Sequence, residues 1–439
     1  MSKIGVQVQT GTVGPSGTPV IAYSNAFFSI VSPWGQDGAV TLVDSPQTFQ
    51  RKFGGLNKMA SLAAGVTDDT ITTETNASVV QAFLAVMQFF AEKGRNTPGI
   101  AYVTRVVKSA SGATAASKNF TDGAANNTTI VAKDKGIWGS AVRVTIANPS
   151  PAKGTGYAQI TVRRRVGSTN LITEVWQIAT AQDAANASRK SELVTITLPA
   201  GGQLPQTATE SKLGNAPGTP GTADAYDASD ADLVGTVSGA NVRTGLQCFN
   251  DPRLGIGGVM IPGKYTATIR TGIMAHAATY DRVGLVGAPS GLTPSTVVAD
   301  LGTTNGDGAY FWPQLEMSDP TSDSGGTILV DPVGSIMGLA ARCHGRYRGP
   351  HKSPAGINNP FMNVLNVERS STNDELCSDD VSNTLDDSFI NTVRIKGSPQ
   401  SIVQWGNATL NSDGRLRQIN ALWTVKLVRQ QGLLLMEPF

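Results

Sequence analysis

The sequence has few of the residues from which most catalytic and metal-binding sites are built. Its 439 residues include only three cysteines and three histidines, and charged residues make up 15%. Cys248, Cys343 and Cys377 are far apart and odd in number, which argues against a disulfide framework and for folding in a reducing cytoplasm. No apolar run approaches the ~18 residues of a membrane-spanning helix, and the N-terminus shows no secretory signal.

The abundant residues are those of turns and buried strands. The chain contains 48 glycines and 23 prolines, and 40% of its residues are hydrophobic. This composition is typical of β-rich domains joined by ordered loops. The net charge of +2 creates no overall field for nucleic acid or an anionic membrane, so we expect neither direct nucleic-acid binding nor membrane insertion. A chain of this length should form several domains.

Periodicity predicts strands and helices of different kinds along the chain. Residues 77–93 have the apolar spacing of a helix, with Asn76 as the N-cap and Gly94 as the end. Short alternating strands from 109 to 198 indicate a small β domain, and the arginines of 163–165 are interpreted as surface residues. Three alternating apolar residues near the start indicate an extended arm with one lone strand: Ile4, Val6 and Val8.

Strands and helices alternate again beyond residue 240. "IGGVMIP", "RVGLVGAP" and "TILVDP" have the composition of buried strands, and helical patterns lie between and after them. This alternation predicts an α/β fold with a largely parallel, doubly wound sheet. Five parts are expected: 1–19, an extended arm; 20–108, the first α/β part of the core; 109–235, an inserted β-rich domain whose stretch 199–232 is a linker or surface loop; 236–370, a doubly wound α/β domain; and 371–439, a C-terminal domain.

No motif predicts catalysis, a metal or a cofactor. "GVMIPGKY" (258–265) has the glycine and lysine spacing of a phosphate loop, but its interior is apolar and contains proline, and Tyr265 replaces the magnesium-binding hydroxyl residue. Cys343 and His344 are adjacent on a predicted helix and point in different directions, and with His351 they do not complete a zinc site. "GSIMG" (334–338) has its serine one place too early for a nucleophile elbow. Asp281, His276 and Ser290 are a triple that any long sequence offers.

Two charged segments stand out near the C-terminus. One is acidic without a cation and the other, beyond Gly414, is basic without an acid. Each segment, taken alone, can be interpreted as an ordinary solvent-exposed face. Together they suggest charge-complementary contacts between copies or with an inner partner. The acidic residues are Asp374, Glu375, Asp379, Asp380, Asp386 and Asp387, and the basic ones are Arg415, Arg417, Lys426 and Arg429.

Five segments, in order, resemble contractile tail sheath proteins of phages and related injection machines. "INTVRIKGSPQSIVQWGNATL" is similar to the family's "GIN-x-IR", glycine turn and "VWGARTL", although Ala408 stands where the family often has arginine. "GRYRGPHKSPAGINN" resembles "RGVHKAPAG", with Ser353 in place of alanine. The other three are "FFSIVSPWGQDGAVTLVDSPQTFQRKFGG", "DKGIWGSAVRVTI" and "DGRLRQINALWTVKLVRQQGLLLMEPF".

The resemblance implies a structural protein rather than an enzyme. It implies a subtilisin-like α/β core with the inserted β domain on the outside, in a virion subunit assembled in the host cytoplasm. Six copies would form each ring around a tail tube protein, between baseplate and tail terminator proteins, with neighbours linked by strand-adding arms. Contraction from a metastable extended state would drive the tube through the host envelope. The basic residues would face the tube and the acidic residues a neighbouring subunit.

Several alternatives stay open. A sheath of a pyocin or a bacterial injection system would carry the same motifs. A doubly wound α/β hydrolase or nucleotide-binding enzyme is a rival of a different class, as is another virion component. Family members usually continue beyond the position of "MEPF" with another α/β stretch and a C-terminal strand, so this sequence is either a short form or a fragment.

Overall fold

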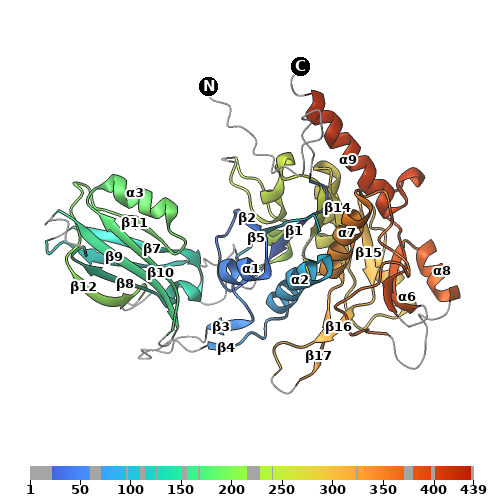
Figure 1. Cartoon of the computed structure of the whole chain (residues 1–439), viewed down its shortest axis with the longest axis horizontal. Coiled ribbons are helices and arrows are strands. Elements are labelled where there is room, and N and C mark those ends of the chain that lie inside the picture. Colours follow the sequence, from blue (N-terminus) through green and yellow to red (C-terminus); the bar gives the residue numbers. More distant parts are fainter. Residues whose placement is uncertain are drawn as a thin grey trace.

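The computed structural model describes residues 22–59, 71–94, 97–108, 114–124, 126–150, 156–166, 169–214, 228–239, 241–322, 325–369, 379–396 and 401–436. The predicted arm strand with Ile4, Val6 and Val8 lies outside these residues. Two lobes lie side by side in Figure 1. The β lobe comprises the described residues of 114–214, and the α/β lobe those of 22–108 and 228–436.

An eight-stranded sheet forms the centre of the α/β lobe. The six inner strands run parallel and the two edge strands antiparallel to their neighbours. The predicted α/β fold with a largely parallel sheet is therefore confirmed, whereas a specifically subtilisin-like arrangement stays a prediction. In spatial order the strands are β2 (Val40–Val43), β5 (Ala101–Arg105), β1 (Asn25–Ile30), β13 (Gly257–Met260), β14 (Val283–Gly287), β15 (Gly308–Trp312), β19 (Ile390–Lys396) and β20 (Ser401–Gln404).

Helices cover both faces of this sheet. Successive strand residues point to opposite faces, so Phe28 packs with one group of helices and Phe27 with the other. The first group comprises α1 (Pro46–Phe53), α2 (Ala77–Lys93), α7 (Val333–Tyr347) and α9 (Ile419–Met436). The second comprises α4 (Asp230–Val234), α5 (Ala267–Thr279), α6 (Pro294–Leu301) and α8 (Asp379–Asp387).

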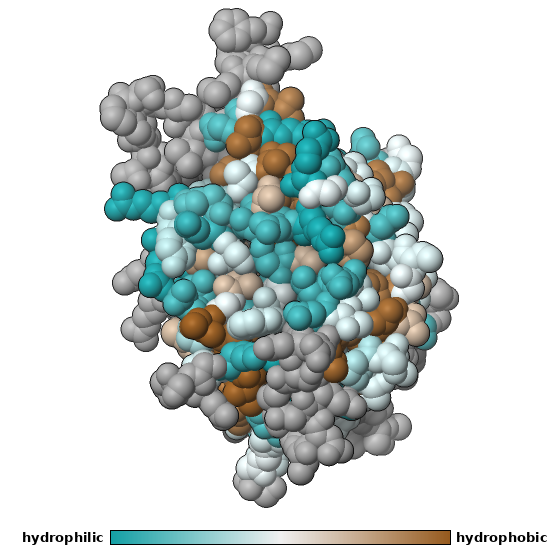
Figure 2. Space-filling view, turned by 90° about the vertical axis from the view of Figure 1, so that its right-hand side faces the viewer, coloured by the Kyte–Doolittle hydropathy of each residue, from teal (hydrophilic) through white to brown (hydrophobic). Residues whose placement is uncertain are grey.

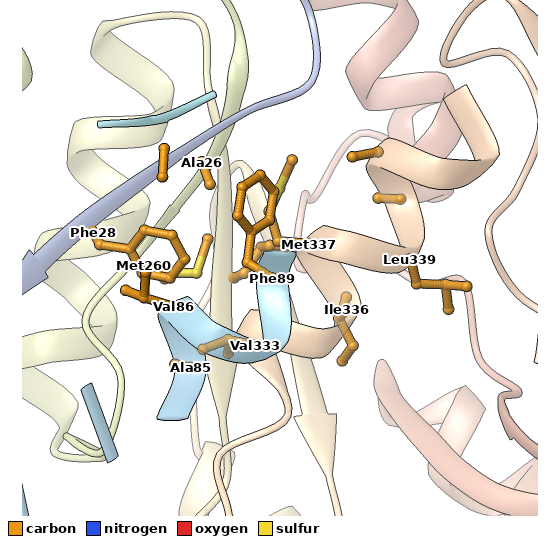
Figure 3. Packing of buried hydrophobic residues seen from close by; sticks show 14 of the residues in the cluster. Ala26, Phe28, Ala85, Val86, Phe89, Met260, Val333, Ile336, Met337 and Leu339 are labelled. Carbon is orange, nitrogen blue, oxygen red and sulfur yellow. The ribbon is translucent and has the colours of Figure 1, made fainter. Parts of the chain in front are cut away.

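Helix α2 packs against the sheet and against α7, which also contacts the sheet. Asn76 accepts hydrogen bonds from the first-turn N–H groups and Gly94 ends the helix with a positive φ, so both predicted boundaries are confirmed. Figure 3 shows Phe89 of α2 beside Met337 of α7 and Phe28 of β1. A Cβ atom on Gly338 would lie 2.6 Å from the Phe89 carbonyl oxygen, so only glycine permits this close approach of the two helices.

The β lobe consists of two antiparallel sheets around a core of their own. Alternate residues of β7 are buried, as the period of a one-sided strand requires. Ile130, Val144 and Ile160 lie in the shared core, which α3 (Ala181–Lys190) covers through Ala184 and Ala187. The sheets are β10 (Thr169–Ile178), β9 (Ala158–Val166), β8 (Val142–Ala147) and β12 (Ala208–Lys212), and β11 (Val194–Thr197), β7 (Asn127–Lys135) and β6 (Ala115–Thr121).

Three sequence interpretations are corrected. Strand β12 lies within the predicted linker 199–232; it is a polar edge strand held by backbone pairing to β8, so its composition resembles that of a loop. "TILVDP" is a strand, β17 (Thr327–Val330), but it pairs antiparallel with β16 (Leu315–Ser318) outside the main sheet. The arginines of 163–165 are not all at the surface, because Arg164 is buried.

The remaining elements are short. They are β3 (Asn57–Met59), β4 (Ile71–Thr73), β18 (Asn366–Val367), and the 3-10 helices η1 (Ile137–Ala141), η2 (Gly245–Phe249), η3 (Pro252–Leu254) and η4 (Gly414–Leu416). Within the part of the chain that the structure describes, no helix combines the length and apolar character needed to cross a bilayer.

Candidate functional site

The segment that mimics a phosphate loop binds a carboxylate of its own chain. The Gly263 N–H donates to Asp331 Oδ2 at 2.9 Å, and the Val333 N–H donates to Oδ1 at 3.2 Å. Burial raises the pKa of Asp331 to about 6, against the lowering effect of these two N–H groups. A phosphate would need the backbone N–H that this carboxylate already occupies, so the loop has a structural role.

Cys343 and His344 face different partners. The Cys343 thiol lies 3.6 Å from the Ser353 carbonyl oxygen, whereas His344 Nδ1 lies 3.0 Å from Ser24 Oγ. Burial lowers the pKa of His344 to about 3, so its imidazole is neutral at physiological pH. Among the described residues, no three His, Cys, Asp or Glu side chains are placed to hold a metal.

The remaining catalytic candidates have other contacts. His276 Nε2 lies 2.8 Å from a guanidinium nitrogen of Arg282, and Asp281 lies 3.2 Å from a guanidinium nitrogen of Arg429. Ser335 of "GSIMG" is fully buried in α7. Neither Asp281 nor His276 is thus available to activate a serine.

The predicted basic residues divide into two sets. Lys426 of α9 is buried between the carboxylates of Asp307 and Asp281, and Arg429, one turn later, also bonds Asp281. The ion pairs of Lys426 therefore hold α9 against the sheet, and Lys426 does not lie on an exposed patch. Its two partner carboxylates lie more than a hundred residues away in the sequence. The residues around Lys426 therefore do not indicate that its charge is paired.

Arg415 and Arg417 form the second set, at the surface, in η4 and directly after it. Arg415 is 90% exposed and its guanidinium lies 2.7 Å from Asp413, just before the segment in which the sequence shows no acid. The hydrogen bond from Arg415 lowers the pKa of Asp413 to about 2. The Arg417 guanidinium lies 4.7 Å from the centre of the Phe389 ring, a distance suited to a cation–π contact.

One groove brings together residues from both charged segments. Its volume is about 500 Å³, and Arg415 and Arg417 line it together with Asp386 of α8. Asp386 and Asp387 are exposed, Asp379 and Asp380 begin α8, and Asp374 and Glu375 lie outside the described residues. We call this surface the C-terminal groove; its lining is Asn383, Asp386, Trp405, Asn407, Ala408, Gly414, Arg415, Arg417, Gln418 and Ala421.

The segment 390–410 builds one wall of the C-terminal groove. Buried Asn391 of β19 accepts from the Ala408 N–H at 2.6 Å and donates to the Ala408 carbonyl at 2.8 Å, which fixes the chain after β20. The backbone N–H of Trp405 donates to the Thr392 carbonyl at 2.8 Å, and the residue is 40% exposed. A glycine at 406 is required because a Cβ there would lie 2.7 Å from the Asn391 Cα.

The C-terminal groove has the composition of a protein contact surface. It combines an exposed tryptophan, two arginines and a carboxylate, the residue types that contribute most to protein interfaces and their specificity. Figure 2 shows the side of the molecule that carries α8 and α9, where hydrophilic side chains predominate and hydrophobic ones are interspersed. Sequence reasoning missed Trp405 as a surface residue, although its position beside glycine after a strand was a signal.

Comparisons with known proteins agree with this architecture. A scan of protein-family models and a search of curated proteins found no match. The sheath tail protein of Listeria innocua superimposes with a TM-score of 0.57 at 11% identity, over 92% of this chain and 74% of that one. A sheath tail protein of Desulfitobacterium hafniense (TM-score 0.48, 10% identity, 97% and 80% coverage) and the contracted helical sheath of the anti-feeding prophage (0.43, 14%, 100% and 77%) are also similar. By its likeness to the Listeria innocua protein, the chain has a tail sheath fold, and the resemblance seen in its motifs is confirmed at that level.

Proposed function

We propose, from this fold, that the chain is the structural subunit of a contractile tail sheath. The observation that carries the proposal is the likeness to a sheath tail protein over 92% of the chain. Copies would form stacked six-membered rings around an inner tail tube, between baseplate and terminator proteins. The sheath would belong to a phage particle or to a related injection machine. No chemistry on a substrate is part of this role.

The lone strand of the N-terminal arm would link neighbouring copies. Ile4, Val6 and Val8 alternate as a strand does, and a strand gains backbone hydrogen bonds by joining the edge of a sheet in another copy. A Gly- and Pro-rich stretch after it would allow subunits to rotate without separating. Contraction would then be a change between two packings of linked subunits, without a nucleotide.

The C-terminal groove would supply the charged part of these contacts. Arg415, Arg417 and Asp386 all line it and are exposed, so the groove offers both signs to a partner. We assign the arginines to a polar contact with the tube and the exposed Asp386 and Asp387 to a neighbouring sheath subunit. Lys426 takes no part, because its charge is satisfied inside the chain.

Assembly on tubes tests this assignment. Arg415→Glu/Arg417→Glu should reduce co-sedimentation with purified tubes at least about tenfold, since like charges at a contact are unfavourable and charged contacts steer association. The matched control is Arg348→Glu/Lys352→Glu, which makes the same charge change at two exposed residues outside the groove. If Arg415→Glu/Arg417→Glu assembled on tubes as the unaltered protein does, the assignment of these arginines to the tube contact would be wrong. Failure of the unaltered chain to assemble on any tube would contradict the proposed sheath function itself.

A further inference from the structure

A second cavity lies between the two lobes, away from the C-terminal groove. Its volume is about 270 Å³. Trp34, β2 and the end of α1 form its wall on the α/β lobe, and β7, β9, β10 and the end of α3 form the wall on the β lobe. In Figure 1, α1 lies on the side of the α/β lobe that faces the β lobe. We call it the interlobe pocket.

Positive charge exceeds negative charge in the interlobe pocket. Among its lining residues six are cationic and two are acidic. The α1 and α3 C-termini each contribute about half a negative charge, and Glu174, which accepts the Glu192 N–H at 2.7 Å, adds one more. An excess of roughly two positive charges remains on this count. The cations are Arg51, Lys52, Lys133, Arg164, Arg189 and Lys190, and the acids Asp134 and Glu192.

The two lining carboxylates already have partners. Asp134 binds the buried Arg164 guanidinium and accepts the Gly35 N–H at 3.1 Å. Glu192 lies 3.7 Å from Arg51. Neither lining carboxylate is therefore available to neutralise Arg189 and Lys190, which are exposed at the end of α3.

Arg164 is the buried cation of the pocket lining. Only 2% of the residue is exposed, its guanidinium lies 5.0 Å from the centre of a Trp34 ring, and it lines the pocket. Its guanidinium already binds Asp134, so it adds positive charge to the wall without being a free donor. The exposed guanidinium groups of Arg51 and Arg189 are suited to oxyanions because their N–H groups match the geometry of these ligands.

We propose that the interlobe pocket binds a small multivalent oxyanion of the phosphate class. Arg51 and Lys52 would approach it from the α/β lobe, and Lys133, Arg189 and Lys190 from the β lobe. The ligand would bridge the lobes, next to the Trp34–Trp138 contact with its ring centroids 4.4 Å apart. It would stabilise their relative orientation by binding only when both walls are in place. This inference does not depend on the proposed sheath function.

Calorimetric titration of the intact protein with sodium pyrophosphate tests the proposal, with ionic strength held constant by sodium chloride. We expect saturable binding of one pyrophosphate per chain. Arg189→Gln/Lys190→Gln, at the exposed end of α3, should weaken binding at least about tenfold, since each lost charge-assisted hydrogen bond lowers affinity substantially. Lys52→Gln should weaken it too, because a bridging ligand contacts both lobes.

The control is Arg348→Gln/Lys352→Gln, two exposed cations that do not line the pocket. It should bind pyrophosphate as the unaltered protein does. Absence of binding by the unaltered protein overturns the proposal. So does equal weakening in the control, which would indicate unspecific attraction to surface charge, or unchanged binding in both pocket variants.

Discussion

The α/β lobe assembles its main sheet from three separate stretches of chain, whereas the β lobe forms from the single stretch 114–214. Strands β13, β14 and β15 are buried at every residue, because helices cover both faces of their sheet. The strands of the β lobe alternate instead between core and surface. The comparison indicates two units with separate cores, in which the α/β lobe depends on contacts between distant segments.

Phe89→Ala should cause the largest loss of stability, and this loss should be confined to the α/β lobe. Phe89 is fully buried in the α/β core, and removal of such a ring costs about 3–5 kcal/mol of unfolding free energy. We expect hydrogen exchange to accelerate in peptides of α2 and α7 and to stay unchanged in peptides of β6–β9. Ile160→Val, in the β core, is the reciprocal control and should cost about 0.5–1.5 kcal/mol there. Equal acceleration in both lobes would contradict separate cores.

Acidification should also separate the lobes. The three histidines are His276, His344 and His351, so the β lobe contains none. Burial lowers the folded-state pKa of His276 and of His344 to about 3, whereas an unfolded histidine accepts a proton near pH 6.5. Their contribution is therefore present above that pH and is lost as the pH falls towards 3.

The expected loss between pH 7 and pH 5 is about 2 kcal/mol for each of the two histidines. Asp331 acts in the opposite direction: its raised folded-state pKa of about 6 means that the folded protein takes up its proton first and gains about 1 kcal/mol over the same interval. Hydrogen exchange at the two pH values, corrected for the intrinsic exchange rate, measures the difference. A β lobe that loses as much protection as the α/β lobe would refute this account.

Lys135→Ala should have the smallest effect, although it removes an ion pair that joins the lobes. Lys135 Nζ lies 2.7 Å from Asp37, but both side chains are partly exposed. Such pairs contribute about 0.2–1 kcal/mol. Thermal unfolding should shift little, and exchange within each lobe should not change. A loss as large as that of Phe89→Ala would show that this contact supports the cores themselves.

Sequence reasoning succeeded where the determining interactions are local. The boundaries of α2 follow from Asn76 and Gly94, two residues that act on their own helix ends. The alternating pattern of β9 also held the information that Arg164 lies on the same face as Val162, yet the three adjacent arginines suggested a surface. The two-residue period of the strand was in this case a better guide to the burial of Arg164 than the charge of its side chain.

It failed where the partner is distant. Lys426 is buried because Asp307 and Asp281 come from other parts of the α/β lobe, and no pattern around Lys426 indicates them. The C-terminal groove likewise depends on α8 lying beside η4 and the chain after β20, which follows from tertiary packing alone. The two charged segments could be recognised in the sequence. That Asp386 and Arg415 line the same groove could not.

The most direct test of the central claim is electron microscopy of the purified protein at rising concentration. The account predicts tubes or stacked six-membered rings, and their loss when residues 1–19 are deleted. A protein that stays monomeric at every concentration, with both lobes folded, would contradict its role as a self-assembling sheath subunit.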